Sequence, residues 1–344
     1  MSLSRRRTLA LALGGGLALA SGRWAANAAA PPAAIPPRGA WRLGLISDLN
    51  GSYGSTSYVP EVARGVALLR RLRPDLVICA GDMVAGQKLS LTDGQLQAMW
   101  VAFAAQVLDP LRQAGIPFAP VIGNHDGSAA ANGRSMVFER ERQQARRFWQ
   151  ARRDRLALPL LEANDFPFQY SFRQGEALVL VIDASAARLA PATLRWLEQQ
   201  LQAPQARAAR LRLVVGHLPL AAVAEGRNRA GEVLADPARL QGLLERTRTT
   251  LYISGHHHAY FPGRTGQLDL LSLGAMGSGP RRLLASARPP HQTLTLLDRQ
   301  GDELIDTTVD LRTGRPLDPA VLPARLDPAQ GPTLRRRPPR WRIS

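Results

Sequence analysis

The chain contains 344 residues, of which 45% are hydrophobic, so it can bury a sizeable core in one large domain or two small ones. Its formal net charge is +17, which raises the question of nucleic-acid binding. However, Lys88 is the only lysine, and the arginines are scattered among alanines and prolines. We interpret the charge as a compositional bias and nucleic acid as a weakly supported partner. The single cysteine, Cys79, excludes an internal disulfide.

Residues 1–28 have the pattern of an export signal. A basic stretch, Arg5 to Arg7, precedes an apolar segment that is too short to span a bilayer, and a small-residue cleavage site ends the region. The sequence Ser4 to Leu9 resembles a twin-arginine signal with Thr8 where that motif prefers Phe; an ordinary secretory signal is the alternative. We therefore expect a periplasmic or secreted protein, with a Pro/Ala-rich linker over 29–39.

Strand and helix patterns alternate along the next part of the chain. Strands are predicted over 41–47, 75–82, 117–126, 211–217, 250–256, 267–273, 292–298 and 303–310, and a hairpin over 168–183. Helices are predicted over 60–73, 93–113, 138–155, 191–202 and 237–246. This alternation indicates one layered α/β domain over 40–312. Residues 313–344 are predicted to form a Pro/Arg-rich tail, of which residues 333–344 are expected to be disordered or to lie on the surface.

Polar residues follow five of the apolar strands. These segments read SDLN (47–50), AGD (80–82), GNHD (123–126), GH (216–217) and GHHH (255–258), and they hold five of the six histidines. The carboxyl ends of strands in an α/β sheet deliver such groups to one edge. Aspartate, asparagine and histidine without thiolate suit Mn, Fe or Zn ions, and the donors are too many for one ion. Taken alone, Asp48 and Asn50 would instead be read as a turn cap.

The five segments, in this order, resemble the motifs of the calcineurin-like metallophosphoesterase family over roughly residues 41–280. The resemblance implies a layered β-sandwich flanked by helices, a four-layer αββα fold, and a hydrolase of phosphoric esters. It also implies two divalent metal ions and a metal-bridging hydroxide that attacks phosphorus.

The resemblance assigns a role to each motif residue. Asp82 would bridge the two ions. The other metal ligands would be Asp48, Asn50 and His258 for the first ion and Asn124, His217 and His256 for the second. His125 would protonate or stabilise the leaving oxygen, and Asp126 would orient His125. We do not expect His257 to be a ligand, and Arg281 and Arg282 are more typical of a surface than of a substrate site.

Asn50 stands where the family has a histidine, and its amide oxygen is usually a weaker donor than imidazole. A non-catalytic or mononuclear metal- or phosphate-binding protein is therefore an alternative. A nucleotide-specific phosphodiesterase is a second alternative. The leading hypothesis is an exported phosphoesterase that acts on small phosphomonoesters or phosphodiesters.

Overall fold

The computed structural model describes residues 34–277 and 279–343, which belong to one compact unit. The expected signal peptide and the first part of the linker lie outside the described residues. Within the described residues, no helix combines the length and the apolar character needed to cross a membrane.

The first sheet has seven strands in the order β15-β14-β13-β1-β2-β3, with β18 paired to β14. Their bounds are β1 Trp41–Ile46, β2 Leu76–Cys79, β3 Phe118–Pro120, β13 Thr293–Gln300, β14 Glu303–Asp310, β15 Arg315–Pro316 and β18 Arg340–Arg342. β1, β2 and β3 run parallel, whereas β13 pairs with β1 in the antiparallel sense. The carboxyl ends of three consecutive parallel strands therefore share one edge.

The second sheet has nine strands in the order β16-β17-β11-β12-β10-β9-β8-β7-β6. Their bounds are β6 Leu160–Asp165, β7 Gln169–Gln174, β8 Ala177–Val181, β9 Leu211–Val215, β10 Leu251–Ser254, β11 Phe261–Thr265, β12 Leu268–Ser272, β16 Arg325–Leu326 and β17 Leu334–Arg336. β8, β9, β10 and β12 run parallel. A separate two-stranded hairpin, β4 (Ala131–Asn132) with β5 (Ser135–Met136), completes the pairing.

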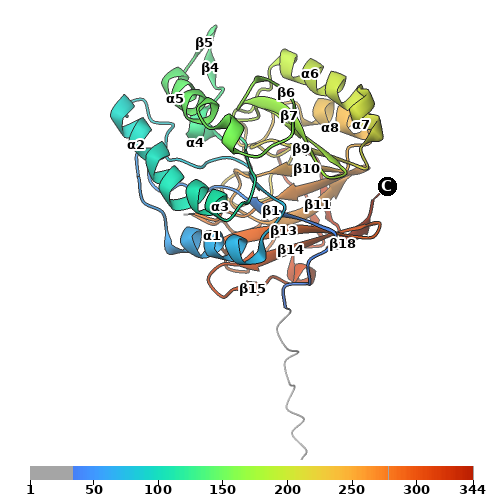
Figure 1. Cartoon of the computed structure of the whole chain (residues 1–344). Coiled ribbons are helices and arrows are strands. Elements are labelled where there is room, and N and C mark those ends of the chain that lie inside the picture. Colours follow the sequence, from blue (N-terminus) through green and yellow to red (C-terminus); the bar gives the residue numbers. More distant parts are fainter. Residues whose placement is uncertain (1–33, 278, 344) are drawn as a thin grey trace, which may run out of the picture. The chain divides into compact units, whose positions relative to one another are not determined.

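Helices cover the sheets on two sides (Figure 1). They are α1 Pro60–Leu72, α2 Asp93–Phe103, α3 Asp109–Gln113, α4 Asn124–Gly127, α5 Glu139–Gln150, α6 Pro191–Gln202, α7 Pro204–Ala208 and α8 Pro237–Arg246. A π-helical stretch, Ala104–Leu108, joins α2 to α3, so the helix expected over 93–113 is continuous but irregular. Three-residue 3₁₀ helices lie at Arg153–Arg155 and Pro319–Val321.

The alternation of side chains along β8 explains the layering. Val179 and Val181 belong to a core cluster shared with the first sheet and with α1, α2 and α5. Leu178 and Leu180 belong to a second cluster with residues of α6 and α8. Because successive side chains of a strand point to opposite faces, β8 is buried on both sides, between the first sheet and the second group of helices. The expected αββα arrangement is confirmed.

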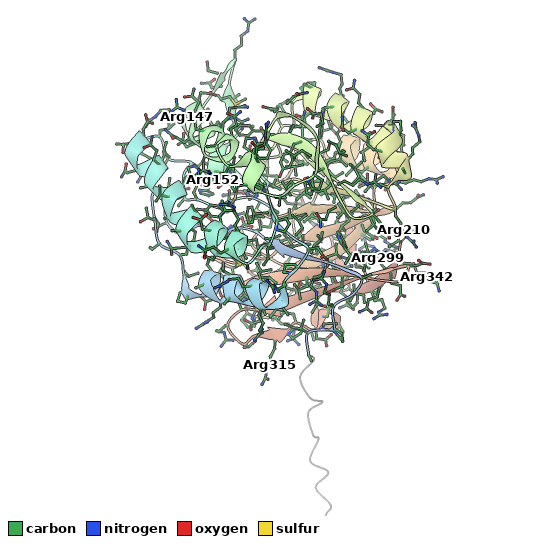
Figure 2. All side chains as sticks on the ribbon, viewed as in Figure 1. Arg147, Arg152, Arg210, Arg299, Arg315 and Arg342 are labelled. Atoms are coloured by element: carbon green, nitrogen blue, oxygen red, sulfur yellow. The ribbon has the colours of Figure 1, made fainter. Side chains whose placement is uncertain are left out.

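Arginines are spread over the molecule. Figure 2 labels six of them, and they lie in different parts of the view, on elements that include α5, β13, β15 and β18. Many arginines pair with carboxylates, as Arg146 does with Asp165 (3.0 Å) and Arg299 with Glu176 (2.9 Å). This distribution agrees with a compositional origin of the net charge.

The structure of the C-terminal segment differs from the expected disordered or surface-lying tail. Its described part adds β15 and β18 to the first sheet and β16 and β17 to the second, so it is neither disordered nor merely lying on the surface. Leu334 and Trp341 are buried. The fully buried Arg337 pairs with Asp306 at 2.7 Å, and its guanidinium lies 3.6 Å from the ring centroid of Trp341. The high content of proline and arginine suggested a solvated tail. Composition alone does not show that one of these arginines, Arg337, pairs with a buried carboxylate.

Removing Arg337 tests whether this segment belongs to the domain. Arg337→Ala leaves the Asp306 carboxylate buried without its cation, so the free energy of unfolding should fall by about 3–5 kcal/mol. Arg335→Ala, at an exposed position of β17, is the matched control and should change it by less than about 0.5 kcal/mol. Urea denaturation of both variants measures the difference. Equal stabilities would show that the segment is not integral to the fold.

Candidate metal centre and active site

The loops that follow β1, β2, β3, β9 and β10 meet at one edge of the structure and are joined by main-chain hydrogen bonds. The Asp48 amide donates to the Gly81 carbonyl (2.9 Å), and the Gly255 amide donates to the His217 carbonyl (3.0 Å). Asp48, Asp82, His256 and His258 all have positive φ, between 54° and 65°. This conformation is strained for residues other than glycine, and such strain concentrates at functional sites.

Glycines provide the space in which the acidic side chains lie. A Cβ at Gly255 would lie 2.7 Å from Oδ2 of Asp48, and a Cβ at Gly123 would lie 2.2 Å from Oδ1 of Asp82. Both distances are shorter than any carbon–oxygen contact that a folded protein tolerates. The glycines of the motifs therefore allow the carboxylates to approach the neighbouring loops closely.

The structure brings the expected aspartates and histidines into two clusters that share Asp82. One cluster contains Asp82, His217 and His256, and the other contains Asp48, Asp82 and His258. Within each cluster the potential ligand atoms lie within 4.8 Å of one another. Two sets of oxygen and nitrogen donors around a common carboxylate are the arrangement that suits metal ions of the Mn, Fe or Zn type.

Hydrogen bonds orient the imidazole rings toward these clusters. Nδ1 of His217 lies 2.7 Å from the Ala80 carbonyl, and Nδ1 of His258 lies 2.8 Å from the Gly279 carbonyl. A carbonyl can only accept, so each Nδ1 carries the proton, and Nε2 faces the carboxylates. Nε2 of His217 lies 3.2 Å from Asp82, and Nε2 of His258 lies 3.3 Å from Asp48.

Asn124 joins the first of these clusters. Its Oδ1 lies 2.9 Å from Nε2 of His217, and its Nδ2 donates to the side-chain oxygen of Gln87 at 2.6 Å. Gln87 thus fixes which end of the amide faces the cluster. Asn50 is buried in the loop after β1, and its main-chain amide donates to the Asp82 carbonyl at 3.2 Å.

The electrostatics of the site favour ionised carboxylates. Burial alone would raise the pKa of Asp82, but the neighbouring His217 and His125 hold it well below its usual range. Burial opposes protonation of His217, yet the charge of Asp82 prevails and raises the pKa of His217 to about 9. The negative charge of Asp82 therefore lies next to the positive charge of the His217 ring.

His125 and Asp126 lie in the short helix α4. Nδ1 of His125 is 3.1 Å from the Gly86 carbonyl, and the ring is 5.3 Å from that of Tyr53, which is 56% exposed. The His125 amide donates to Oδ1 of Asp82 at 2.9 Å. The half-buried ring thus directs Nε2 away from Gly86, at the border between the metal ligands and solvent.

Asp126 has a different role from the one expected. Its carboxylate accepts hydrogen bonds from the main-chain amides of Asp82, Met83, Val84 and Gly123, at 2.8–3.0 Å. Burial and the charge of Asp82 raise the pKa of Asp126 to about 7. Asp126 therefore holds the loop after β2 against the loop after β3, while the Gly86 carbonyl is the group that orients His125.

Glu232 was not anticipated from the sequence. Its Oε2 lies 3.0 Å from Nε2 of His256, and Arg227 and Arg229 pair with the same carboxylate. Burial lowers the pKa of His256 to about 4, so the ring is neutral at pH 7, with Nε2 donating to Glu232 and Nδ1 available to a cation. Glu232 lies in a loop without motif or periodicity, so no sequence signal marks it.

His257 is a structural residue, in agreement with its exclusion from the expected ligands. Its Nδ1 accepts from the Val223 amide at 3.1 Å, and its Nε2 lies 2.9 Å from the Glu232 carbonyl. Burial lowers the pKa of His257 to about 3, so the ring stays neutral. His257 therefore fastens the loop that carries Glu232 to the metal-binding loop.

Comparison with known families shows which family the chain belongs to. A model of the calcineurin-like phosphoesterases matches residues 42–260. The chain belongs to this family. The protein is accordingly a hydrolase of phosphoric ester bonds, and the expected recognition, fold class and enzyme class are confirmed. A comparison with curated proteins finds no significant match.

Three solved structures are similar to this chain at low sequence identity, and of these the first, with a TM-score of 0.50, supports the fold of this phosphoesterase. GAP50, the anchor in the inner membrane complex of Plasmodium, is 14% identical with a TM-score of 0.50, over 81% of this chain and 87% of that one. YfcE, a phosphoesterase from E. coli, is 13% identical with a TM-score of 0.34, over 80% and 97%. TT1561 of Thermus thermophilus is 11% identical with a TM-score of 0.40, over 80% and 97%.

Glu232 provides a test of the metal centre that does not depend on turnover. Glu232→Gln removes the charge that orients and polarises His256, so the affinity for Mn²⁺ should fall by about 10- to 100-fold. Isothermal titration calorimetry with Mn²⁺ measures the change. Glu225→Gln, a half-exposed glutamate of the same loop, is the control and should bind Mn²⁺ as the wild type does. Equal affinity of both variants would refute the role given to Glu232.

Proposed function

We propose that this phosphoesterase is a dinuclear enzyme that hydrolyses small phosphomonoesters or phosphodiesters. The observation that supports it best is the sharing of the Asp82 carboxylate by two three-residue clusters. A carboxylate placed between two donor sets can bridge ions about 3.5–4 Å apart. If the protein bound a single ion, one of the two clusters would have no ion to bind.

The donor set fits two divalent ions of the Mn, Fe or Zn type. Asp48, His258 and the loop residue Asn50 would hold the first ion, and Asn124, His217 and His256 the second, with Asp82 common to both. When bound, the ions lower the pKa of a water nucleophile and neutralise charge on the phosphoryl oxygens. The buried positions of Asp48 and Asp82 exclude bulk water from these donors and strengthen their interaction with a cation.

The remaining chemistry is assigned to His125. Nδ1–H donates to the Gly86 carbonyl, so Nε2 is the atom that gives a proton to, or interacts with, the leaving oxygen. The hydrogen bond from the His125 amide to Asp82 fixes the backbone of this residue relative to the shared carboxylate. The main-chain amide of His125 thus positions the residue, and its Nε2 interacts with the leaving oxygen.

Two variants separate metal binding from catalysis. With Mn²⁺ and 4-nitrophenyl phosphate, His125→Ala should lower kcat by about 10²–10⁴-fold while two equivalents of metal remain bound. Asp82→Asn should lose both metal and activity because it removes the charge common to both clusters. Plasma emission spectroscopy and steady-state kinetics provide the two readouts.

The metal content and turnover of the wild-type protein also distinguish an enzyme from the alternative, a metal-binding protein. One equivalent of metal or none in the wild-type protein, without turnover, would support a binding protein instead of an enzyme. Full activity of His125→Ala would exclude the role given to that residue. Comparing 4-nitrophenyl with bis(4-nitrophenyl) phosphate then separates monoesterase from diesterase activity.

We also propose export by the twin-arginine route, on the basis of residues 1–28. In a Gram-negative host, the wild-type protein should reach the periplasm, and the double variant Arg5→Lys with Arg6→Lys should remain in the cytoplasm. Cell fractionation and immunoblotting measure the distribution. Export of the double variant would favour the ordinary secretory route, and a cytoplasmic wild-type protein would contradict export itself.

A further inference from the structure

A cavity of about 280 Å³ lies beside the candidate metal centre. Three separate segments line it: the end of the GHHH motif and the residues before β11, the loop before β13, and the segment from β15 to the 3₁₀ helix Pro319–Val321. We call it the C-terminal cavity, because the C-terminal segment 313–344 provides one of its walls.

The C-terminal cavity is continuous with the metal centre through His258 and Arg281, which both line it. The Arg281 amide donates to the His258 carbonyl at 3.0 Å. Its guanidinium extends to the loop that carries Glu232, where a Cβ at Gly226 would lie 3.4 Å from Nη1. A molecule in the cavity would therefore have one end next to His258, which belongs to the cluster with Asp48 and Asp82.

Arg281 has unused capacity to bind an anion. Its Nε is buried and has no hydrogen-bond partner among the described residues. An unsatisfied buried donor is costly, and a phosphoryl oxygen would satisfy it. Contrary to the expectation of a surface position, Arg281 is half-buried, whereas Arg282 is exposed.

Beyond Arg281, the walls of the C-terminal cavity are mainly apolar. They include Leu283, Pro290, Leu317, Val321 and Leu322. The imidazole of His291 also lines the cavity, but its Nδ1 is paired with Asp310 at 3.2 Å. The hydroxyl of Thr293 is buried without a partner among the described residues and offers a polar contact. The other polar side chains of the lining include Ser286, Arg288 and Asp318. The cavity thus combines a cationic end near the metal centre with an apolar interior.

We propose that the C-terminal cavity binds the organic part of the substrate, and that this part is an alkyl or aryl group. The inference rests on the proposed phosphoesterase function, and Arg281 would contact the phosphoryl group at the cavity entrance. The size is suitable, because an apolar cavity of about 150 Å³ accommodates benzene. A volume of about 280 Å³ therefore accepts a six-carbon chain or a substituted ring.

The test compares two esters of primary alcohols, n-hexyl phosphate and glycerol 1-phosphate. The wild-type protein should favour hexyl phosphate by at least about tenfold in kcat/KM, as burial of two methylenes already suffices for this factor. Val321→Trp fills the cavity from a position that is 40% exposed, and it should reduce the preference to about onefold with unchanged metal content. Val101→Trp, on the exposed face of α2, is the matched control and should keep the preference.

A second measurement does not depend on folding of the variants. With 4-nitrophenyl phosphate as substrate, hexylphosphonate should inhibit the wild-type protein at least about tenfold more strongly than methylphosphonate. If neither 4-nitrophenyl phosphate nor bis(4-nitrophenyl) phosphate is hydrolysed, the proposed function fails. If either is hydrolysed but both alkyl esters react equally and both phosphonates inhibit equally, the function stands and the C-terminal cavity is not the substrate site.

Discussion

The burial of the Asp82 carboxylate at the meeting point of five loops is the constraint on which the rest of the site depends. Its two oxygens contact different partners, the amide of His125 and the imidazole of His217. A buried carboxylate is tolerated only where such partners compensate for the loss of water. The loops must therefore converge within hydrogen-bonding distance, and that convergence creates the two clusters.

Further residues maintain this convergence without touching a metal. Asp126 gathers the amides at the ends of two strands, and His257 fastens the loop that carries Glu232. Glu232 in turn directs His256 toward the centre. The strained positive-φ conformations of the ligand residues persist because these contacts fix the loops from several sides. Contacts within the protein therefore position the side chains of both clusters.

The C-terminal segment contributes both to the packing of the domain and to a wall of the C-terminal cavity. Arg337 anchors it through Asp306 and Trp341, and its strands extend both sheets. The part between β15 and β16 closes one side of the C-terminal cavity. Because the family match ends at residue 260, this segment is a place where the phosphoesterase can acquire selectivity without changes to the common centre.

The sequence by itself determined the strands that precede the motifs, the main helices and the family. The motifs were readable because each consists of neighbouring residues at the end of an apolar strand, and strand ends in a layered α/β fold share an edge. The hairpin near Gly175 and helices α1, α6 and α8 were predicted for the same reason, since their patterns are local. The metal number, the export route and the contribution of Asn50 stay predictions.

Only the tertiary structure decided the roles that depend on contacts between distant positions. Asp126 was expected to orient its neighbour His125, but its carboxylate reaches the loop after β2 across more than 40 positions. Glu232 finds His256 from a loop without any pattern, and Arg337 finds Asp306 from a segment that reads as solvated. The role of a buried polar group depends on the group with which it forms hydrogen bonds, and the packing of the whole domain determines which group that is.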